Sequence, residues 1–100
     1  MTTATRSEAL PDIPTMAEFV PGYEAVGWYG IGAPKSTSGE IIGRLNNETN
    51  AILADAKFRS LLADLGAVPM SMAPAEFAKF VAEETEKWSK VIQVANIKLE

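Results

Sequence analysis

The sequence predicts a small α/β protein with three main helices, one long strand and one short strand. Three observations carry this prediction. An almost unbroken apolar run spans residues 23–33, apolar side chains recur at helical spacing in three later stretches, and Pro or Gly marks most of the boundaries between these segments. One hundred residues allow at most one small domain.

Residues 1–15 are polar and interrupted by two prolines, which favours an ordered loop. Thr15 is placed to cap a short helix over residues 16–20, with Glu18 as its reciprocal partner. The pair Pro21-Gly22 then predicts a turn.

Residues 23–33 form the main strand candidate. Their apolar content is too continuous for a strand with one face in water, and it is typical of strands covered on both faces. Gly27, Gly30 and Gly32 weaken such a strand unless the backbone bends or approaches another element closely. We therefore expect this segment to be built into something larger than itself.

The remaining elements are predicted from periodicity and caps. Thr37 and Glu40 fit a capping box that opens a first helix, which ends near Ala54. Asp55 is placed to cap a second helix, which Gly66 closes.

A short strand is expected over residues 67–72, where Pro69 restricts it to a sheet edge or a strand start. Pro74 suits the first turn of a third helix, for which Asn96 is a plausible stop. This third helix places aromatic and aliphatic residues on one stripe and charged residues on the opposite face.

The composition excludes several classes of function. The chain has no Cys and no His, so thiol nucleophiles, zinc–thiolate sites and imidazole acid–base catalysis are absent. The net charge of -4 argues against binding to nucleic acid. No stretch reaches the roughly 20 apolar residues of a membrane span. The first six residues lack an apolar core, so we expect no signal peptide in this chain.

An ordered set of short motifs runs along nearly the whole chain. The set comprises Leu10-Pro11-Asp12-Ile13-Pro14-Thr15, Pro21-Gly22-Tyr23-Glu24, Trp28-Tyr29-Gly30, Ala33-Pro34, Thr37, Glu40-Ile41-Ile42, Arg44-Leu45-Asn46, Leu65-Gly66-Ala67, Pro74-Ala75-Glu76-Phe77, Glu86-Lys87-Trp88, Lys90-Val91-Ile92 and Ala95-Asn96-Ile97-Lys98. Together these motifs resemble the C-terminal part of the Bug, or TctC-like, receptors. Those receptors are the periplasmic substrate-binding proteins of tripartite tricarboxylate transporters.

The resemblance implies a segment of a two-domain, type II-like periplasmic-binding-protein fold that closes on a small carboxylate. Residues 1–22 would end the second domain, residues 23–34 would be the interdomain crossing strand, and residues 35–100 would pack on the first domain. The implied partners are the remainder of the receptor, the membrane permease subunits of the transporter, and a ligand held largely by loops that have no counterpart here. The resemblance implies no cofactor, and a periplasmic location for the full-length receptor.

Trp28 and Tyr29 are the candidate ligand-binding residues, because aromatic rings often line the cleft around a small ligand. The competing interpretation places both rings in the hinge and the core. The residues Thr37, Ser38 and Gly39 open a helix, and helix N-termini bind anions, but capping explains these residues better because Glu40 follows.

No catalytic or metal-binding residue is predicted. Asp12, Glu18 and Glu24 have no fixed mutual distance, so they fit solvated or capping roles better than acid–base catalysis. Two main hypotheses therefore remain at the level of sequence. The chain is either a receptor segment or a truncated module that associates with itself through the surface meant for the missing domain. A small enzyme is the weakest hypothesis, since no residue cluster supports it.

Overall fold

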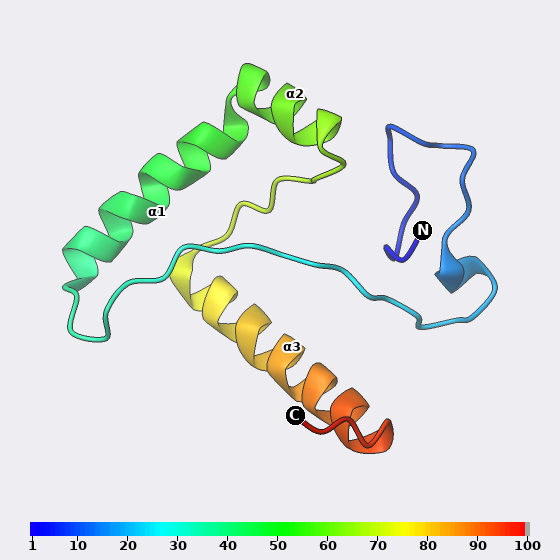
Figure 1. Cartoon of the computed structure of the whole chain (residues 1–100). Helices are drawn as coiled ribbons and strands as arrows, with labels where there is room; N and C mark the ends of the chain where they lie inside the picture. The colour runs from blue at the N-terminus through cyan, green and yellow to red at the C-terminus, as the bar shows by residue number, and fades with distance from the viewer. Residues whose placement is uncertain (100) are drawn as a thin grey trace.

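The computed structural model describes residues 1–99. It contains a short 3-10 helix, η1 (Met16–Glu18), followed by three α-helices, α1 (Gly39–Ala54), α2 (Ala56–Asp64) and α3 (Pro74–Val94). Figure 1 shows α1 and α2 meeting at a corner, while α3 begins close to α1 and points away from both helices toward the C-terminus. A long extended segment runs from the N-terminal loop across α3 to the start of α1. None of the described helices is long and apolar enough to cross a membrane.

The predicted α/β fold class is wrong for the described chain. Residues 23–33 and 67–72 are extended, but neither segment forms a strand, and residues 1–99 contain no sheet. A strand requires main-chain hydrogen bonds to a neighbouring segment. The main-chain groups of residues 26–33 form no such bond with any other described backbone group, so the chain is helical. The sheet expected of a type II-like binding-protein fold is therefore not formed within residues 1–99.

The helix boundaries follow local capping chemistry. Ser38, not the predicted Thr37, caps α1, and its Oγ accepts a hydrogen bond from the Ile41 amide at 3.4 Å. Asp55 separates α1 from α2 as predicted, and its Oδ1 accepts a hydrogen bond from the Phe58 amide at 2.9 Å.

The ends of the second and third helices lie near the predicted residues. Gly66 follows α2 with a φ of 71°, and Asn96 follows α3 with a φ of 52°. Both residues adopt the left-handed conformation that commonly ends a helix. Ala73 precedes α3 and offers no side-chain oxygen, but its amide donates a hydrogen bond to Glu76 at 3.1 Å.

The N-terminal segment folds back on itself before the extended segment begins. The Met1 ammonium group donates to the Pro14 carbonyl at 2.9 Å, and the Ala25 amide donates to the Thr2 carbonyl at 2.9 Å. The Thr15 amide donates to Glu18 at 3.1 Å, which is one half of the predicted capping box. The other half is absent, because the buried Thr15 hydroxyl has no hydrogen-bond partner.

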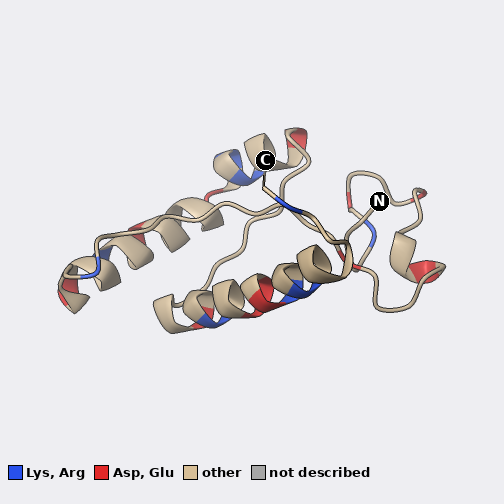
Figure 2. Cartoon of the chain, turned by 60° about the horizontal axis from the view of Figure 1, so that its bottom comes forward, with Lys and Arg blue, Asp and Glu red and all other residues tan. Residues whose placement is uncertain are grey.

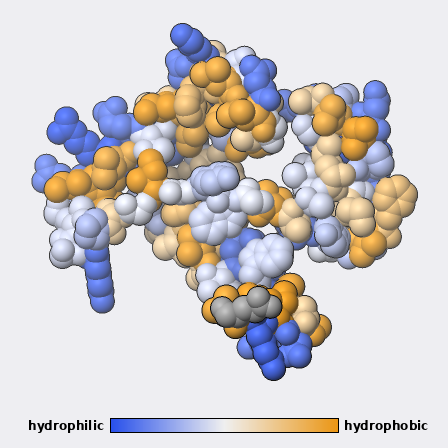
Figure 3. Space-filling model, viewed as in Figure 1, coloured by the Kyte–Doolittle hydropathy of each residue, from blue (hydrophilic) through white to orange (hydrophobic). Residues whose placement is uncertain are grey.

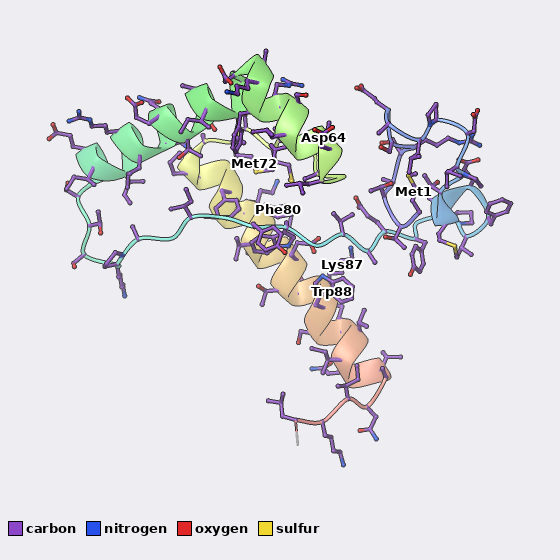
Figure 4. All side chains as sticks on the ribbon, turned by 45° about the horizontal axis from the view of Figure 1, so that its top comes forward. Met1, Asp64, Met72, Phe80, Lys87 and Trp88 are labelled. Atoms are coloured by element: carbon purple, nitrogen blue, oxygen red, sulfur yellow. The ribbon has the colours of Figure 1, made fainter. Side chains whose placement is uncertain are left out.

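Two asparagines join α1 to the segment that precedes α3. The Nδ2 atoms of Asn46 and Asn50 donate to the Met72 carbonyl at 2.7 and 3.2 Å. Asn50 also donates to the Asn46 side-chain oxygen at 3.3 Å. Figure 4 shows Met72 below α1, in the extended segment that leads to α3. These contacts hold residues 67–73 against α1 through side chains, without a sheet.

The described chain has no hydrophobic core. Among residues 1–99 no hydrophobic side chain is buried, and Thr15 is the only buried residue. The accessible surface is 8413 Å², whereas a compact monomer of 10.7 kDa exposes about 5,500 Å². The radius of gyration is 16.5 Å, compared with about 13 Å for a compact domain of this length. Figure 3 shows the consequence, since hydrophobic residues gather on the outside over α1, α2 and the N-terminal segment.

Candidate functional site

Trp28 lies in a small aromatic cluster where the extended segment crosses α3. Its ring meets Phe77 edge-on with a centroid distance of 5.8 Å and Phe80 with a centroid distance of 5.3 Å. Phe77 and Phe80 themselves lie one turn apart on α3, with centroids 6.3 Å apart. Figure 4 shows Phe80 at this crossing point. The cluster half-buries Trp28 and fixes the extended segment against α3.

Gly30 allows the backbone to approach α3 at this point. A Cβ atom added at Gly30 would overlap the ring of Phe77, whereas one added at Gly27 or Gly32 would meet nothing within 4 Å. The sequence argument that a glycine in this run marks a close approach therefore applies to Gly30.

Tyr29 points away from the cluster. Its side chain is fully exposed, and that of Ile31, two residues on, is 72% exposed. Consecutive residues of an extended backbone point to opposite sides. The two predicted site residues are therefore not brought together: Trp28 faces α3, and Tyr29 lies on the open side of the segment.

The start of α1 carries a cap and shows no arrangement specific for an anion. The Ser38 hydroxyl accepts the hydrogen bond of the Ile41 amide, and Glu40 places a negative charge in the first turn. A carboxylate in this position repels an anion at the helix N-terminus. The capping interpretation of this motif is supported, with Ser38 in place of Thr37.

Glu18, one of the acidic residues of the N-terminal segment, is held in an ion pair with Arg6. Arg6 binds both carboxylate oxygens of Glu18, at 2.6 and 2.7 Å. The hydrogen bond from Arg6, helped by the Thr15 amide, lowers the pKa of Glu18 to about 2. A carboxylate with so low a pKa is a poor general base at neutral pH. Glu18 thus acts as a structural ion-pair partner.

Two depressions lie away from the predicted site residues. The first has a volume of about 450 Å³ at the junction of α1 and α2, and it is lined by Glu48, Ala51, Ile52, Asp55, Lys57, Phe58 and Leu61. The second, of about 330 Å³, lies beside the last turn of α3. Both are shallow and largely apolar. Within residues 1–99, no group of three or more acidic side chains is placed to hold a metal ion.

Two contacts were not predicted from the sequence. The pair Arg6 and Glu18 is separated by 12 positions, and nothing in the local pattern indicates it. Asn46 and Asn50 are one helical turn apart on α1, so their shared face was visible in the sequence. Their common acceptor at Met72 was not visible, because it lies on another element.

Comparison with known proteins gives a match along almost the whole chain. Residues 1–97 match the family described as tripartite tricarboxylate transporter family receptor, TctC. The chain belongs to this family. Its members are periplasmic solute receptors that serve transport, and the family is not a class of enzymes.

Two curated relatives show the extent of the similarity. A UPF0065 protein from the tcbD–tcbE intergenic region of Pseudomonas sp. strain P51 is 37% identical over 94 residues, which are 92% of this chain and 28% of that protein. Protein BugT of Bordetella pertussis is 35% identical over 95 residues, which are 94% of this chain and 29% of BugT.

The backbone of this chain also superposes on part of a solved structure. The chain superposes on R. palustris Rpa4515, solved with adipate, with a TM-score of 0.83 and 38% identity, over 96% of this chain and 32% of that one. The chain therefore spans less than a third of the length of these relatives.

Proposed function

We propose that this chain is the C-terminal part of an extracytoplasmic solute receptor that binds small carboxylates for a tripartite tricarboxylate-type transporter. The observation that carries the proposal is the backbone match to the receptor solved with adipate, which extends over 96% of the chain. The family match over residues 1–97 supports it independently. The ligand class is taken from that relative, and the proposed transporter partners are the membrane permease subunits.

In this proposal the chain has a mechanical role and performs no chemistry. Residues 1–22 end the second domain, residues 23–34 cross between the domains, and residues 35–100 pack on the first domain. Two contacts support this division: the folded-back N-terminal segment joins the start of the crossing segment through Ala25, and the Trp28 cluster packs the middle of that segment against α3. The receptor would close by moving one end of this segment relative to the other.

Trp28 and Tyr29 have different proposed parts in ligand binding. Trp28 packs in the hinge against Phe80 and holds the crossing segment in place. Tyr29 has the exposed ring that can line the interdomain cleft and contact the ligand. Most of the carboxylate's hydrogen bonds would come from loops that the rest of the receptor supplies.

A chimera tests this proposal. The matched third of the R. palustris receptor is replaced by residues 1–97 of this chain, and adipate is titrated in by calorimetry, with the unaltered receptor as reference. We expect a folded chimera that binds adipate, and we expect the 100-residue chain alone to show no micromolar binding. A chimera that does not fold, or that folds and does not bind, contradicts the proposal. Micromolar binding by the chain alone contradicts the assignment of the ligand loops to the rest of the receptor.

The runner-up function is a structural module that associates with itself and has no ligand. The absence of any buried hydrophobic side chain among the described residues favours it, since exposed apolar surface drives association. Sedimentation of the pure chain distinguishes the two. A defined dimer with a cooperative melt supports the module, whereas a receptor segment is expected to show no defined oligomer and a broad melt.

A further inference from the structure

The charges of this chain leave two extended segments uncharged. Residues 25–34 and 65–75 contain no Asp, Glu, Lys or Arg, although these types make up 22% of the sequence. Figure 2 shows most of the charged residues on the helices and the N-terminal segment, while long stretches of the connecting chain are tan. A solvent-exposed connecting loop is normally polar. The lack of charge indicates that both segments are covered in the working protein.

Both uncharged segments are also open to a partner. In the first segment Ile31 is 72% exposed, and in the second Val68 is 76% exposed. The main-chain groups of residues 26–33 and 68–72 form no hydrogen bond with another described backbone group. Among them only the Met72 carbonyl accepts hydrogen bonds from side chains. Unsatisfied main-chain groups beside apolar side chains are the features by which an extended segment binds another polypeptide edge to edge.

Each segment is already held in position on its other side. The Trp28 cluster fixes the first segment against α3. Asn46 and Asn50 fix the second against α1 through the Met72 carbonyl. The open side is therefore presented by a preorganised support, which reduces the entropy lost on docking.

The size of the exposed surface identifies the kind of occupant. The chain exposes roughly 2,900 Å² more than a compact monomer of its mass. A standard protein–protein interface covers only about 800 Å² on each partner, so the excess is typical of an obligate assembly. The chain spans 32% of the receptor that it superposes on. The rest of such a receptor is about twice the size of this chain, which is large enough to cover the exposed surface.

We propose that residues 25–34 and 67–73 are the two docking segments of this chain, and that their occupant is the remaining two-thirds of a receptor of the same family, which the chain binds even when that part is a separate polypeptide. The proposal rests on the proposed function and adds the docking surface and assembly in trans. The partner supplies apolar side chains and main-chain donors and acceptors to both segments.

The test uses the complete 100-residue chain and the part of the R. palustris receptor that the chain does not match, produced separately. The chain is titrated into that part, and the affinity is measured by sedimentation. The receptor's own matched third serves as the positive control. Hydrogen exchange then reports whether the amides of residues 26–33 and 68–72 become protected in the complex.

Three variants define the surface. Ile31→Glu and Val68→Glu each place a charge on one docking segment and are expected to weaken association at least about tenfold. Ser89→Glu adds the same charge on an exposed position of α3 and is expected to change the affinity by less than about twofold. Circular dichroism of each isolated variant checks that the helices are intact.

Each outcome decides the proposal. A complex in which both segments are protected, and which both docking variants weaken, supports it. Absence of a complex, protection of one segment only, or equal effects of all three variants overturns it. Protection of both segments in the chain alone at rising concentration also overturns it, because the occupant is then a second copy. If the chimera described above binds adipate while the separate parts fail to assemble, this inference fails and the proposed function stands.

Discussion

The ring of Phe77 occupies the space that a side chain at Gly30 would need. With the Phe77 ring in this position, the extended segment can cross α3 at the aromatic cluster because residue 30 has no Cβ atom. This contact links residues 47 positions apart, and it fixes which face of the extended segment packs on α3 and which remains open.

Gly30→Ala is expected to lower the stability of the crossing by about 1–3 kcal/mol, because the Phe77 ring must move out of a packed position. The midpoint of thermal unfolding of the chimeric receptor measures the effect. Gly32→Ala is the matched control, since a Cβ atom there meets nothing within 4 Å. Equal midpoints for the two variants would show that the contact with Phe77 does not constrain the segment.

Removing the amides that bind the Met72 carbonyl is expected to loosen residues 67–73. Because the two donors share one acceptor, either single change leaves a hydrogen bond in place, and the double variant Asn46→Ala with Asn50→Ala should cost more than either alone, about 1–3 kcal/mol. The same thermal midpoint measures it. Asn47→Ala is the control, because Asn47 is an exposed residue of α1. Additive single effects would argue against a shared acceptor.

Loss of the Asp55 cap is expected to shorten α2. Asp55→Ala removes the acceptor of the Phe58 amide and should destabilise the helix by about 1 kcal/mol. Asp64→Ala, at the other end of α2, should leave the helix unchanged or slightly more stable, because a negative charge at a helix C-terminus is unfavourable. Ellipticity at 222 nm of the isolated chain compares the two, and an equal loss of signal would contradict the capping role.

The ion pair of Arg6 and Glu18 makes the N-terminal segment sensitive to acid. The pKa of Glu18 is lowered from 4.5 to about 2, so the folded state favours the ionised carboxylate. Its stabilising contribution is complete above pH 4.5 and is lost as the pH falls through about 2. Carbon-detected titration of the Glu18 carboxyl by nuclear magnetic resonance measures this pKa. Arg6→Met should return it toward 4.5, and an unchanged pKa in that variant would rule out Arg6 as the cause.

The helices could be predicted because their signals are local. Pro74 and Asn96 bracket α3 as expected, and Asp55 separates α1 from α2, since a cap or a helix stop depends on only a few neighbouring residues. The displaced cap of α1, Ser38 for Thr37, arises because two hydroxyl residues one position apart can both serve as a cap. The short helix predicted over residues 16–20 is also displaced at its end, since η1 stops at Glu18.

The prediction of two strands was wrong because a strand forms only when a neighbouring segment pairs with its main chain. The apolar run over residues 23–33 was interpreted as a strand covered on both faces, but no described residue pairs with it. The separation of Trp28 from Tyr29 could have been predicted, since neighbours on an extended backbone point to opposite sides. The contacts of Asn46 with Met72 and of Arg6 with Glu18 could not, because each joins positions far apart in the sequence.

The most direct test of the account is calorimetric titration of adipate into the chimera that carries residues 1–97 of this chain, beside the same titration of the chain alone. The account predicts saturable binding by the chimera and none by the isolated chain. A folded chimera that fails to bind adipate, when the unaltered receptor binds it under the same conditions, would contradict the claim that this chain is a working segment of a carboxylate receptor.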